Sequence, residues 1–312
     1  MRPPRRGPSD RRLARRSRHA QDNEGGSGVN LINFDKEFFS YSGQDIRYSA
    51  TGAESIPETV YDPEEPPVIR AEGTTTISYF ATDRAGNLET PKTLTVKIDK
   101  TPPTANVSIN GGDDFTNDTT LNLTLNSNDP SPGSGVAQMR FSNDGTSWSE
   151  WEPFASNKEW AVSEGDGEKT VHVQYKDTAS NQSDTAQDTI VLDQTAPVVS
   201  STSPFNNQTG VSATANVSAT FTESGSGINL NTFNTDSFKV VLLKPTGNVP
   251  VSSGTFSLNE DSQGSQTVTF DPSSSLAKGA YQVTITGVKD KAGNALANDY
   301  TWRFATAGPS KR

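Results

Sequence analysis

Carboxylates are the side chains of this sequence with the widest scope for chemistry, and the chemistry that suits them is binding of a hard cation. The 312 residues include 37 Asp and Glu, two histidines and no cysteine. Without cysteine, thiol catalysis, disulfide bonds and Cys-based zinc or iron–sulfur sites are excluded. With only His19 and His172, a multi-histidine metal centre is excluded as well. Ca²⁺ takes oxygen ligands from Asp, Glu, Asn and backbone carbonyls. A metal site made of oxygen ligands is therefore the kind that this sequence can form.

The sequence carries no recognisable catalytic apparatus. His172 lies on the polar phase of an alternating segment, which is the position of a surface histidine. The acidic residues are scattered and give no specific pair of the kind that glycoside hydrolysis needs. We find no P-loop, no Gly-rich nucleotide motif after a strand and no His-Glu-x-x-His motif. We therefore expect no enzymatic activity.

Internal repetition is the strongest signal along the chain. The pattern Asp-x-Ala-x-Asn occurs at 83–87, 177–181 and 290–294. A second pattern, Asp-x-Thr-x-Pro after an apolar strand, occurs at 98–104 and 192–198. The first two copies of both patterns are 94 residues apart, from 83 to 177 and from 99 to 193. This period predicts tandem modules joined by short linkers that proline stiffens.

The modules are expected to be β-sandwiches, because apolar and polar residues alternate with a period of two. Each Asp-x-Ala-x-Asn segment then fits a hairpin turn before a last strand, predicted at 92–98, 189–192 and 301–305. Several alternating strands per ~100 residues favour the immunoglobulin style of sandwich. The alternation is clearest in three groups of residues: Leu121, Leu123 and Leu125; Val171, Val173 and Tyr175; and Val217, Ala219 and Phe221.

These patterns resemble the bacterial immunoglobulin-like (Ig-like) repeats of secreted and cell-surface proteins. Residues 73–99 resemble the end of one such repeat, and residues 134–181 resemble another. The third copy resembles the SbsA-type (S-layer) Ig-like domain, with one departure at Thr222-Glu223-Ser224. The residues that carry the third resemblance are Ala196-Pro197, Thr202-Ser-Pro204, Gly210-Val211, Phe270-Asp-Pro272, Leu276–Gly279, Tyr281, Gly287-Val288, Asp290–Asn294 and Trp302-Arg-Phe304.

We therefore predict an all-β chain of three tandem Ig-like sandwiches in an elongated array. Residues 1–29 are predicted to be a disordered basic tail, because positions 1–20 hold eight arginines against one acidic residue. The first module has few residues for its opening strands, so we expect it to be incomplete, in a fragment or a chain with a misassigned start. The predicted ranges are 30–101, 102–195 and 196–307 for the modules and 308–312 for a C-terminal tail.

The loop positions of an Ig-type sandwich, applied to this sequence, bring acidic residues together in two groups of three, which we call the acidic triads. In such a sandwich the loops between strands two and three and between strands six and seven gather where the chain enters. Three carboxylates at each junction would be hard oxygen ligands for calcium, so calcium is the cofactor that the pattern suggests, although none is required. The predicted ligands are Asp99, Asp129 and Asp177 for the middle module and Asp193, Glu223 and Asp290 for the third. The alternative is that each acidic residue serves only its own turn.

Aromatic residues in the middle module offer a second kind of site. Trp148, Trp151 and Trp160 have flat apolar faces on which a sugar ring can stack. Trp148 and Trp151 are three residues apart, so a regular strand would place them on opposite faces, with at least one in the core. Core packing is thus the competing interpretation.

The combined expectation is a non-catalytic extracellular or cell-surface protein whose Ig-like modules act as spacers or adhesion modules. The alternatives are a carbohydrate-binding module that uses the tryptophans and an accessory fragment of a larger secreted hydrolase. The folded part is expected not to bind nucleic acid, because residues 21–312 hold 36 acidic residues against 19 basic ones. No run of about 18 apolar residues predicts a membrane span. The extracellular or surface partner is not specified by any motif.

Overall fold

The computed structural model describes residues 29–30, 45–62, 64–83, 85–261 and 265–307. Most of the predicted basic tail and the predicted C-terminal tail lie outside these residues. The described regular structure is β-strand apart from the short 3₁₀ helix η2 (Leu230–Thr232), so the all-β prediction is confirmed. The chain forms two compact units. The described parts of the first unit are the residues up to Thr104, Ser127–Gln138 and Tyr175–Asp184. The described parts of the second unit are Ala105–Asn126, Met139–Gln174 and the residues from Thr185 onward.

The strands between residues 106 and 192 form two sheets, as expected for an Ig-type sandwich. Alternation along β9 is complete, since Leu121, Leu123 and Leu125 are buried and their neighbours are exposed. The three-stranded sheet has the order β12 (Asn157–Ala161), β9 (Thr120–Asn126) and β7 (Asn106–Ile109). The five-stranded sheet has the order β11 (Glu152–Pro153), β10 (Val136–Ser142), β13 (Gly167–Asp177), β14 (Ala186–Leu192) and β8 (Phe115–Thr116).

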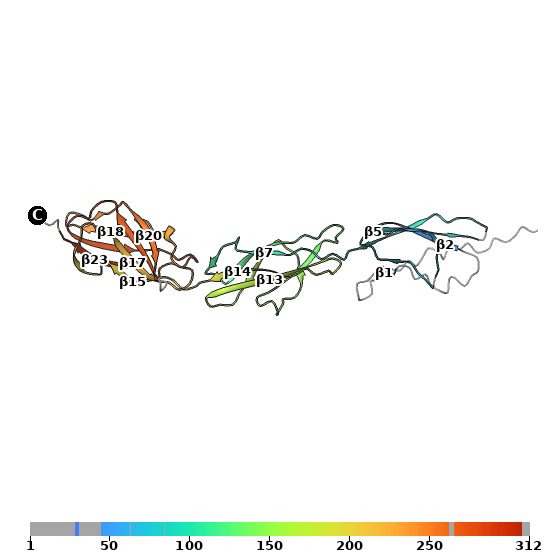
Figure 1. Cartoon of the computed structure of the whole chain (residues 1–312), viewed down its shortest axis with the longest axis horizontal. Coiled ribbons are helices and arrows are strands. Elements are labelled where there is room, and N and C mark those ends of the chain that lie inside the picture. Colours follow the sequence, from blue (N-terminus) through green and yellow to red (C-terminus); the bar gives the residue numbers. More distant parts are fainter. Residues whose placement is uncertain (1–28, 31–44, 63, 84, 262–264, 308–312) are drawn as a thin grey trace, which may run out of the picture. The chain divides into compact units, whose positions relative to one another are not determined.

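The strands between residues 198 and 306 also form two sheets (Figure 1). Their inner faces carry an aromatic cluster. In it the rings of Phe238 and Trp302 make an edge-to-face contact, with 5.9 Å between ring centres. One sheet has the order β15 (Val198–Ser203), β17 (Val217–Thr222), β21 (Gln266–Pro272) and β20 (Gly254–Glu260). The other has the order β16 (Gln208–Val211), β23 (Tyr300–Thr306), β22 (Ala280–Ile285), β18 (Phe238–Leu243) and β19 (Val249–Pro250).

The strands before residue 99 form one larger sheet and one short pair. The buried core here is small, and it comprises Ala50, Ile69, Ile77, Val96 and Ile98. The four-stranded sheet has the order β3 (Ile56–Val60), β2 (Asp45–Gly52), β5 (Gly73–Thr82) and β6 (Lys92–Ile98), and the pair is β1 (Val29–Asn30) with β4 (Val68–Ile69). Val29 of β1 pairs with Ile69, although the prediction placed Val29 in the tail. The module boundaries and the incompleteness of the first module stay predictions.

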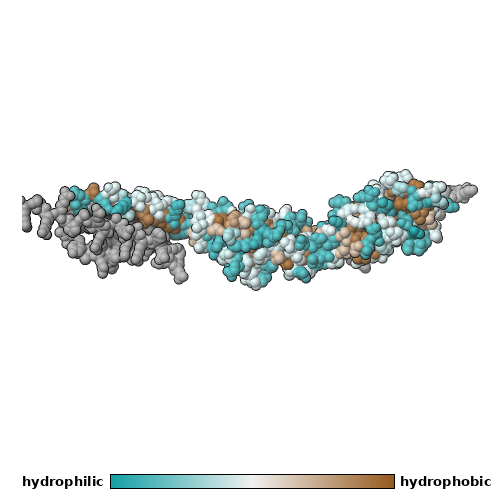
Figure 2. Space-filling view, turned by 180° about the vertical axis from the view of Figure 1, so that it is seen from behind, coloured by the Kyte–Doolittle hydropathy of each residue, from teal (hydrophilic) through white to brown (hydrophobic). Residues whose placement is uncertain are grey.

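Apolar residues face inward and polar residues face outward on most strands. On the face shown in Figure 2, small apolar patches lie among hydrophilic residues. Among the described residues, no helix has the length and apolar character needed to cross a membrane. The three Asp-x-Ala-x-Asn segments lie at the turns where the sequence predicts them, after β5, β13 and β22.

Candidate functional site

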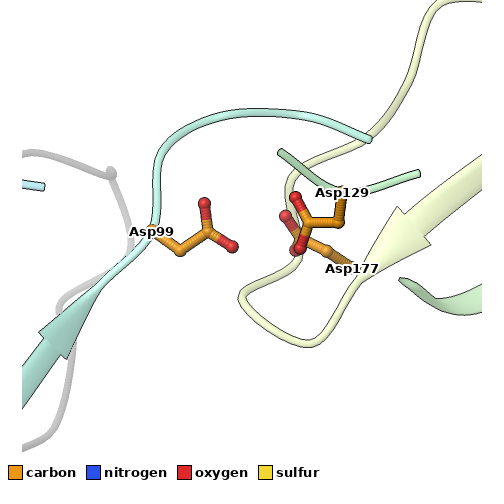
Figure 3. A group of neighbouring side chains, drawn as sticks. All are labelled: Asp99, Asp129 and Asp177. Atoms are coloured by element: carbon orange, nitrogen blue, oxygen red, sulfur yellow. The ribbon is translucent and has the colours of Figure 1, made fainter. Parts of the chain in front are cut away.

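The structure brings the first predicted triad together. Asp99 follows β6 in the linker, Asp129 lies in the loop after β9, and Asp177 ends β13. One carboxylate oxygen from each residue lies within 4.8 Å of the others. Figure 3 shows the three carboxylates pointing into a shared space from three separate segments. All three residues belong to the first compact unit.

The second triad repeats this arrangement in the other compact unit. Asp193 follows β14, Glu223 follows β17, and Asp290 lies in the hairpin between β22 and β23. Their carboxylate oxygens satisfy the same 4.8 Å limit. Asp193 and Asp290 are completely buried. A buried carboxylate is costly unless it is paired or hydrogen-bonded, so the partners of each acidic group decide what the cluster does.

The linker aspartate accepts the same two backbone N–H bonds in both triads. Thr101 N donates to Asp99 Oδ1 at 3.1 Å, and Ser134 N donates to Oδ2 at 2.7 Å. In the second triad, the N–H groups of Thr195 and Ser226 donate to Asp193 at 3.1 and 2.6 Å. The linker carboxylate is thereby tied to the loop that carries the second acidic residue.

The hairpin aspartate is held by the asparagine that ends its motif. Asn181 donates its N–H to Asp177 Oδ1 and its amide group to Oδ2, both at 2.8 Å. The same amide group donates to the backbone carbonyl of Asp99 at 3.1 Å. Asn294 makes the corresponding bonds to Asp290, and its amide reaches the carbonyl of Asp193. The motif therefore joins its own turn to the linker.

The third acidic residue of each triad has one buried oxygen without a partner. Gly135 N donates to Asp129 Oδ2 at 2.5 Å, and Gly225 N donates to Glu223 Oε1 at 2.8 Å. The other oxygens, Asp129 Oδ1 and Glu223 Oε2, are inaccessible to solvent and accept no hydrogen bond. A buried acceptor of this kind is rare in a native protein and calls for an explanation.

Two glycines that the sequence analysis did not single out make room for the carboxylates. A Cβ at Gly133 would lie 2.5 Å from Asp129 Cγ, and one at Gly225 would overlap the Asp193 carboxylate. Serine follows in both loops, and its Oγ accepts from the hairpin backbone at Ala179 N or Ala292 N, each at 3.0 Å. The recurring Gly-Ser-Gly at 133–135 and 225–227 was the available sequence signal.

Burial and mutual repulsion raise the affinity of two of the acidic groups for a proton. Burial raises the pKa of Asp177, the bonds from Asn181 oppose this, and the charges of Asp99 and Asp129 add to the increase. Burial likewise raises the pKa of Glu223, with a further increase from Asp193 and Asp290. Each triad thus concentrates negative charge in a site shielded from water, which a cation would neutralise.

The tryptophans are arranged differently from the expectation of opposite faces. The guanidinium of Arg140 lies 4.8 Å from the ring centre of Trp148 and 4.6 Å from that of Trp151. Both residues lie in an irregular segment between β10 and β11, so the alternation of a strand does not apply to them. Trp160 packs on Phe141 at 5.1 Å between ring centres. One face of Trp148 and of Trp151 is therefore occupied by arginine.

A family model described as bacterial Ig-like domain matches residues 193–306. Domains of this kind are generally non-catalytic structural or interaction modules and are typical of extracellular or surface proteins. None of the curated proteins matches the chain. The matched range begins at Asp193, so it includes the linker residue of the second triad.

Solved structures with Ig-like or fibronectin-like folds are similar to the chain at low identity. The fibronectin(III)-like modules of Clostridium thermocellum CbhA have 18% identity and a TM-score of 0.29, with 54% of this chain and 86% of that one covered. Three N-terminal domains of the bacteriophage RB49 outer capsid protein Hoc have 10% identity and a TM-score of 0.39, with 85% of this chain and 88% of that one covered. The FN1–FN3 domains of chicken CNTN1 have 12% identity and a TM-score of 0.31, with 85% of this chain and 90% of that one covered.

All three TM-scores lie below 0.5, so the assignment of the fold rests on the strand order and on the family match. The strand order of residues 198–306 is that of an Ig-type sandwich, and the family model covers this same region. The finer SbsA-type assignment stays a prediction. Residues 193–306 therefore form a bacterial Ig-like domain.

Proposed function

We propose that this chain is a non-catalytic structural protein of the cell surface or extracellular space, in which Ig-like modules act as spacers. We further propose that each acidic triad binds one Ca²⁺ and thereby fixes the linker to the module that follows it. The observation that carries the metal proposal is the repetition of one contact pattern, with the same buried oxygen unpaired in both triads.

Carboxylate chemistry supports a hard cation at these positions. In each triad every carboxylate oxygen but one accepts an N–H bond, and the remaining oxygen is buried. A carboxylate oxygen has a second lone pair available for a metal when it already accepts one hydrogen bond. Ca²⁺ accepts six to eight oxygen ligands in flexible geometry, so three carboxylates together with backbone carbonyls or water suit it.

The consequence of binding would be mechanical as well as thermodynamic. Because Asp99 and Asp193 belong to linkers, an ion bound to them would connect the linker with two loops of the following module. An ion that binds only the folded state stabilises it by about 2.7 kcal/mol when its free concentration is 100 times Kd. The spacer function would then depend on the calcium concentration outside the cell.

Thermal unfolding in calcium and in excess EDTA tests the metal proposal. We expect a higher melting temperature in millimolar Ca²⁺, and titration calorimetry should count two ions per chain. Asp99→Asn and Asp193→Asn should each remove one ion. Asp184→Asn is the matched control, because Asp184 is exposed and lies outside both triads. An unchanged melting temperature and the absence of binding heat would overturn the proposal.

The carbohydrate-binding alternative has less geometric support. Arg140 occupies one face of Trp148 and of Trp151, and Trp160 donates its ring N–H to Asn143 Oδ1 at 2.6 Å. This arrangement is better suited to holding the segment after β10 against the sheet. Retention of the chain on a polysaccharide column, with loss of retention in Trp151→Ala, would favour the alternative. The accessory-fragment alternative concerns sequence outside this chain.

A further inference from the structure

The first module carries a preformed copy of the hairpin that holds the linker in the other two. Asp83 Oδ1 accepts the N–H of Asn87, and Oδ2 accepts its side-chain amide, both at 2.8 Å. Asp83 N donates to the carbonyl of Asn87 at 3.0 Å, which closes the turn. These bonds match those of Asp177 with Asn181 in length and in the atoms used. The hairpin is thus folded in the same way at all three positions.

The first copy differs from the other two in what covers it. Asp177 and Asp290 are 2% and 0% exposed, whereas Asp83 is exposed, and Leu88 beside it is 69% exposed. In the other copies the asparagine amide also donates to the carbonyl of a linker aspartate. Among the described residues, the second amide hydrogen of Asn87 has no such acceptor. Within the part of the chain that the structure describes, the first hairpin therefore has the donor in place but no linker carbonyl that accepts from it.

The neighbouring sheet edge shows the same difference. In the middle module, β8 pairs in parallel with β14, where Val191 N donates to Asp114 O and Asp193 N to Thr116 O. In the third module, β16 pairs in parallel with β23. The described strands include none that pairs with the outer edge of β6.

Register identifies the backbone groups at that edge. Ile98 of β6 pairs with Gly73, just as Leu192 of β14 pairs with Gly167. Lys97 therefore corresponds to Val191, and Asp99 corresponds to Asp193. By this correspondence, the N–H groups of Lys97 and Asp99 point outward and can donate to a parallel strand.

We propose that this end of the first module, formed by Asp83, Asn87 and the outer edge of β6, is a docking site for an extended polypeptide segment. The segment would carry an aspartate ahead of a short β-strand, as residues 98–116 do for the middle module. Its aspartate carbonyl accepts from Asn87, and its strand adds in parallel to β6, which is a form of strand addition to an open edge. The inference relies on the proposed function only in treating the chain as tandem Ig-like modules.

The chemistry of the site argues against the third module of a second copy as the occupant. The segment that leaves β23 reads Thr306-Ala307-Gly-Pro, without the acidic residue of the other linkers. An Asp-x-Thr-x-Pro pattern is also absent from the sequences of segments 1–28 and 31–44. The expected partner is therefore a linker of the Asp-x-Thr-x-Pro type with the strand that follows it.

Hydrogen exchange on the full chain in EDTA tests the site apart from calcium binding. In the free chain we expect the Lys97 amide to exchange at least tenfold faster than the Val191 amide, since Val191 has its parallel partner. A synthetic peptide with the sequence of residues 97–118 should slow the Lys97 amide severalfold in a saturable way. Asn87→Ala should remove this protection, and the control variant Asn259→Ala, at an exposed asparagine of β20 far from the site in sequence, should retain it.

Two results would overturn the docking site. One is equally slow exchange of Lys97 and Val191 in the free chain, with release after removal of residues 1–28, because the chain's own segment would then occupy the edge. The other is no peptide protection at millimolar concentration, or equal protection in Asn87→Ala. Neither result bears on the calcium proposal, because EDTA is present throughout.

Discussion

The side-chain amide of Asn294 donates a hydrogen bond of 2.7 Å to the backbone carbonyl of Asp193, which lies 101 residues earlier. The same amide donates to Asp290 Oδ2 at 2.8 Å. One side chain thus connects the entry of the third module with its last hairpin. Because Asp290 and Asp193 are both completely buried, the connection lies in a region from which water is excluded.

Asn294→Ala should destabilise the third module. The substitution leaves the buried carboxylate of Asp290 without its amide donor, and an unsatisfied buried charge costs about 2 kcal/mol or more. Urea unfolding followed by Trp302 fluorescence measures the loss. Asn259→Ala is the control, because Asn259 is an exposed asparagine on β20 of the same module, and its effect should be much smaller. Equal effects of the two variants would show that burial of the site is unimportant.

Gly225→Ala should destabilise the same module and weaken the second triad. A Cβ at this position overlaps the Asp193 carboxylate, so the loop or the aspartate must move. Overpacking of this kind costs about 1–3 kcal/mol. Gly225 is not among the glycines with positive φ, so the loss is expected to be steric. Ser224→Ala is the control, because Ser224 is the exposed neighbour in the same loop and its substitution adds no Cβ. An equal loss in Ser224→Ala and Gly225→Ala would contradict the steric argument.

Arg140→Lys should loosen the segment that carries Trp148 and Trp151. The planar guanidinium of Arg140 faces both rings and donates two hydrogen bonds to Gln174 Oε1, at 2.9 and 2.6 Å. The single ammonium group of lysine cannot reproduce this pair of hydrogen bonds together with the stacking. We expect a loss of about 1 kcal/mol and a shift in tryptophan emission.

Arg303→Lys is the matched control for Arg140→Lys. Arg303 donates the same pair of bonds to Gln282 Oε1 on an exposed sheet face, and no described aromatic ring faces its guanidinium. An identical stability change in the two variants would mean that the tryptophan stacking contributes nothing.

Acidification should destabilise the middle module through Asp144. Backbone N–H bonds from Ser147 and Thr146 hold the pKa of this carboxyl well below its ordinary value of 3.8. A lowered pKa in the folded state gives stability that is fully present above pH 3.8 and is lost as the pH falls toward the folded value. The slope of melting temperature against pH below 3.8 should therefore decrease in Asp144→Asn. An unchanged slope would count against this assignment.

Periodicity made the hairpin turns and the meeting of the triad residues predictable from the sequence. The three Asp-x-Ala-x-Asn copies lie at hairpin turns because Asp accepts N–H groups of the tight turn that Asn closes, a local property that residue type reveals. The predicted final strand 92–98 agrees with β6. The triads followed from the loop positions of an Ig-type sandwich, since these are set by topology rather than by side-chain detail.

Features that depend on close approach in space were not predictable. Gly133 and Gly225 appear in the sequence as ordinary loop residues, and only the folded chain shows a carboxylate against each. Trp148 and Trp151 were placed on opposite faces because a strand was assumed, whereas their segment is irregular and both rings turn to Arg140. The unpaired oxygens of Asp129 and Glu223 depend on the geometry of every neighbouring donor.

The bonds between linker and hairpin also define where an inheritable unit of this chain begins. The carboxylate and the carbonyl of Asp99 accept from Ser134 and Asn181, both of which lie farther along the chain. A gene segment that began at Pro102 would lose Asp99 and leave these two donors without their acceptor, whereas one that began at Ile98 would keep all three residues. Recombination that shuffles such modules is therefore expected to preserve function only when the linker travels with the module on its C-terminal side.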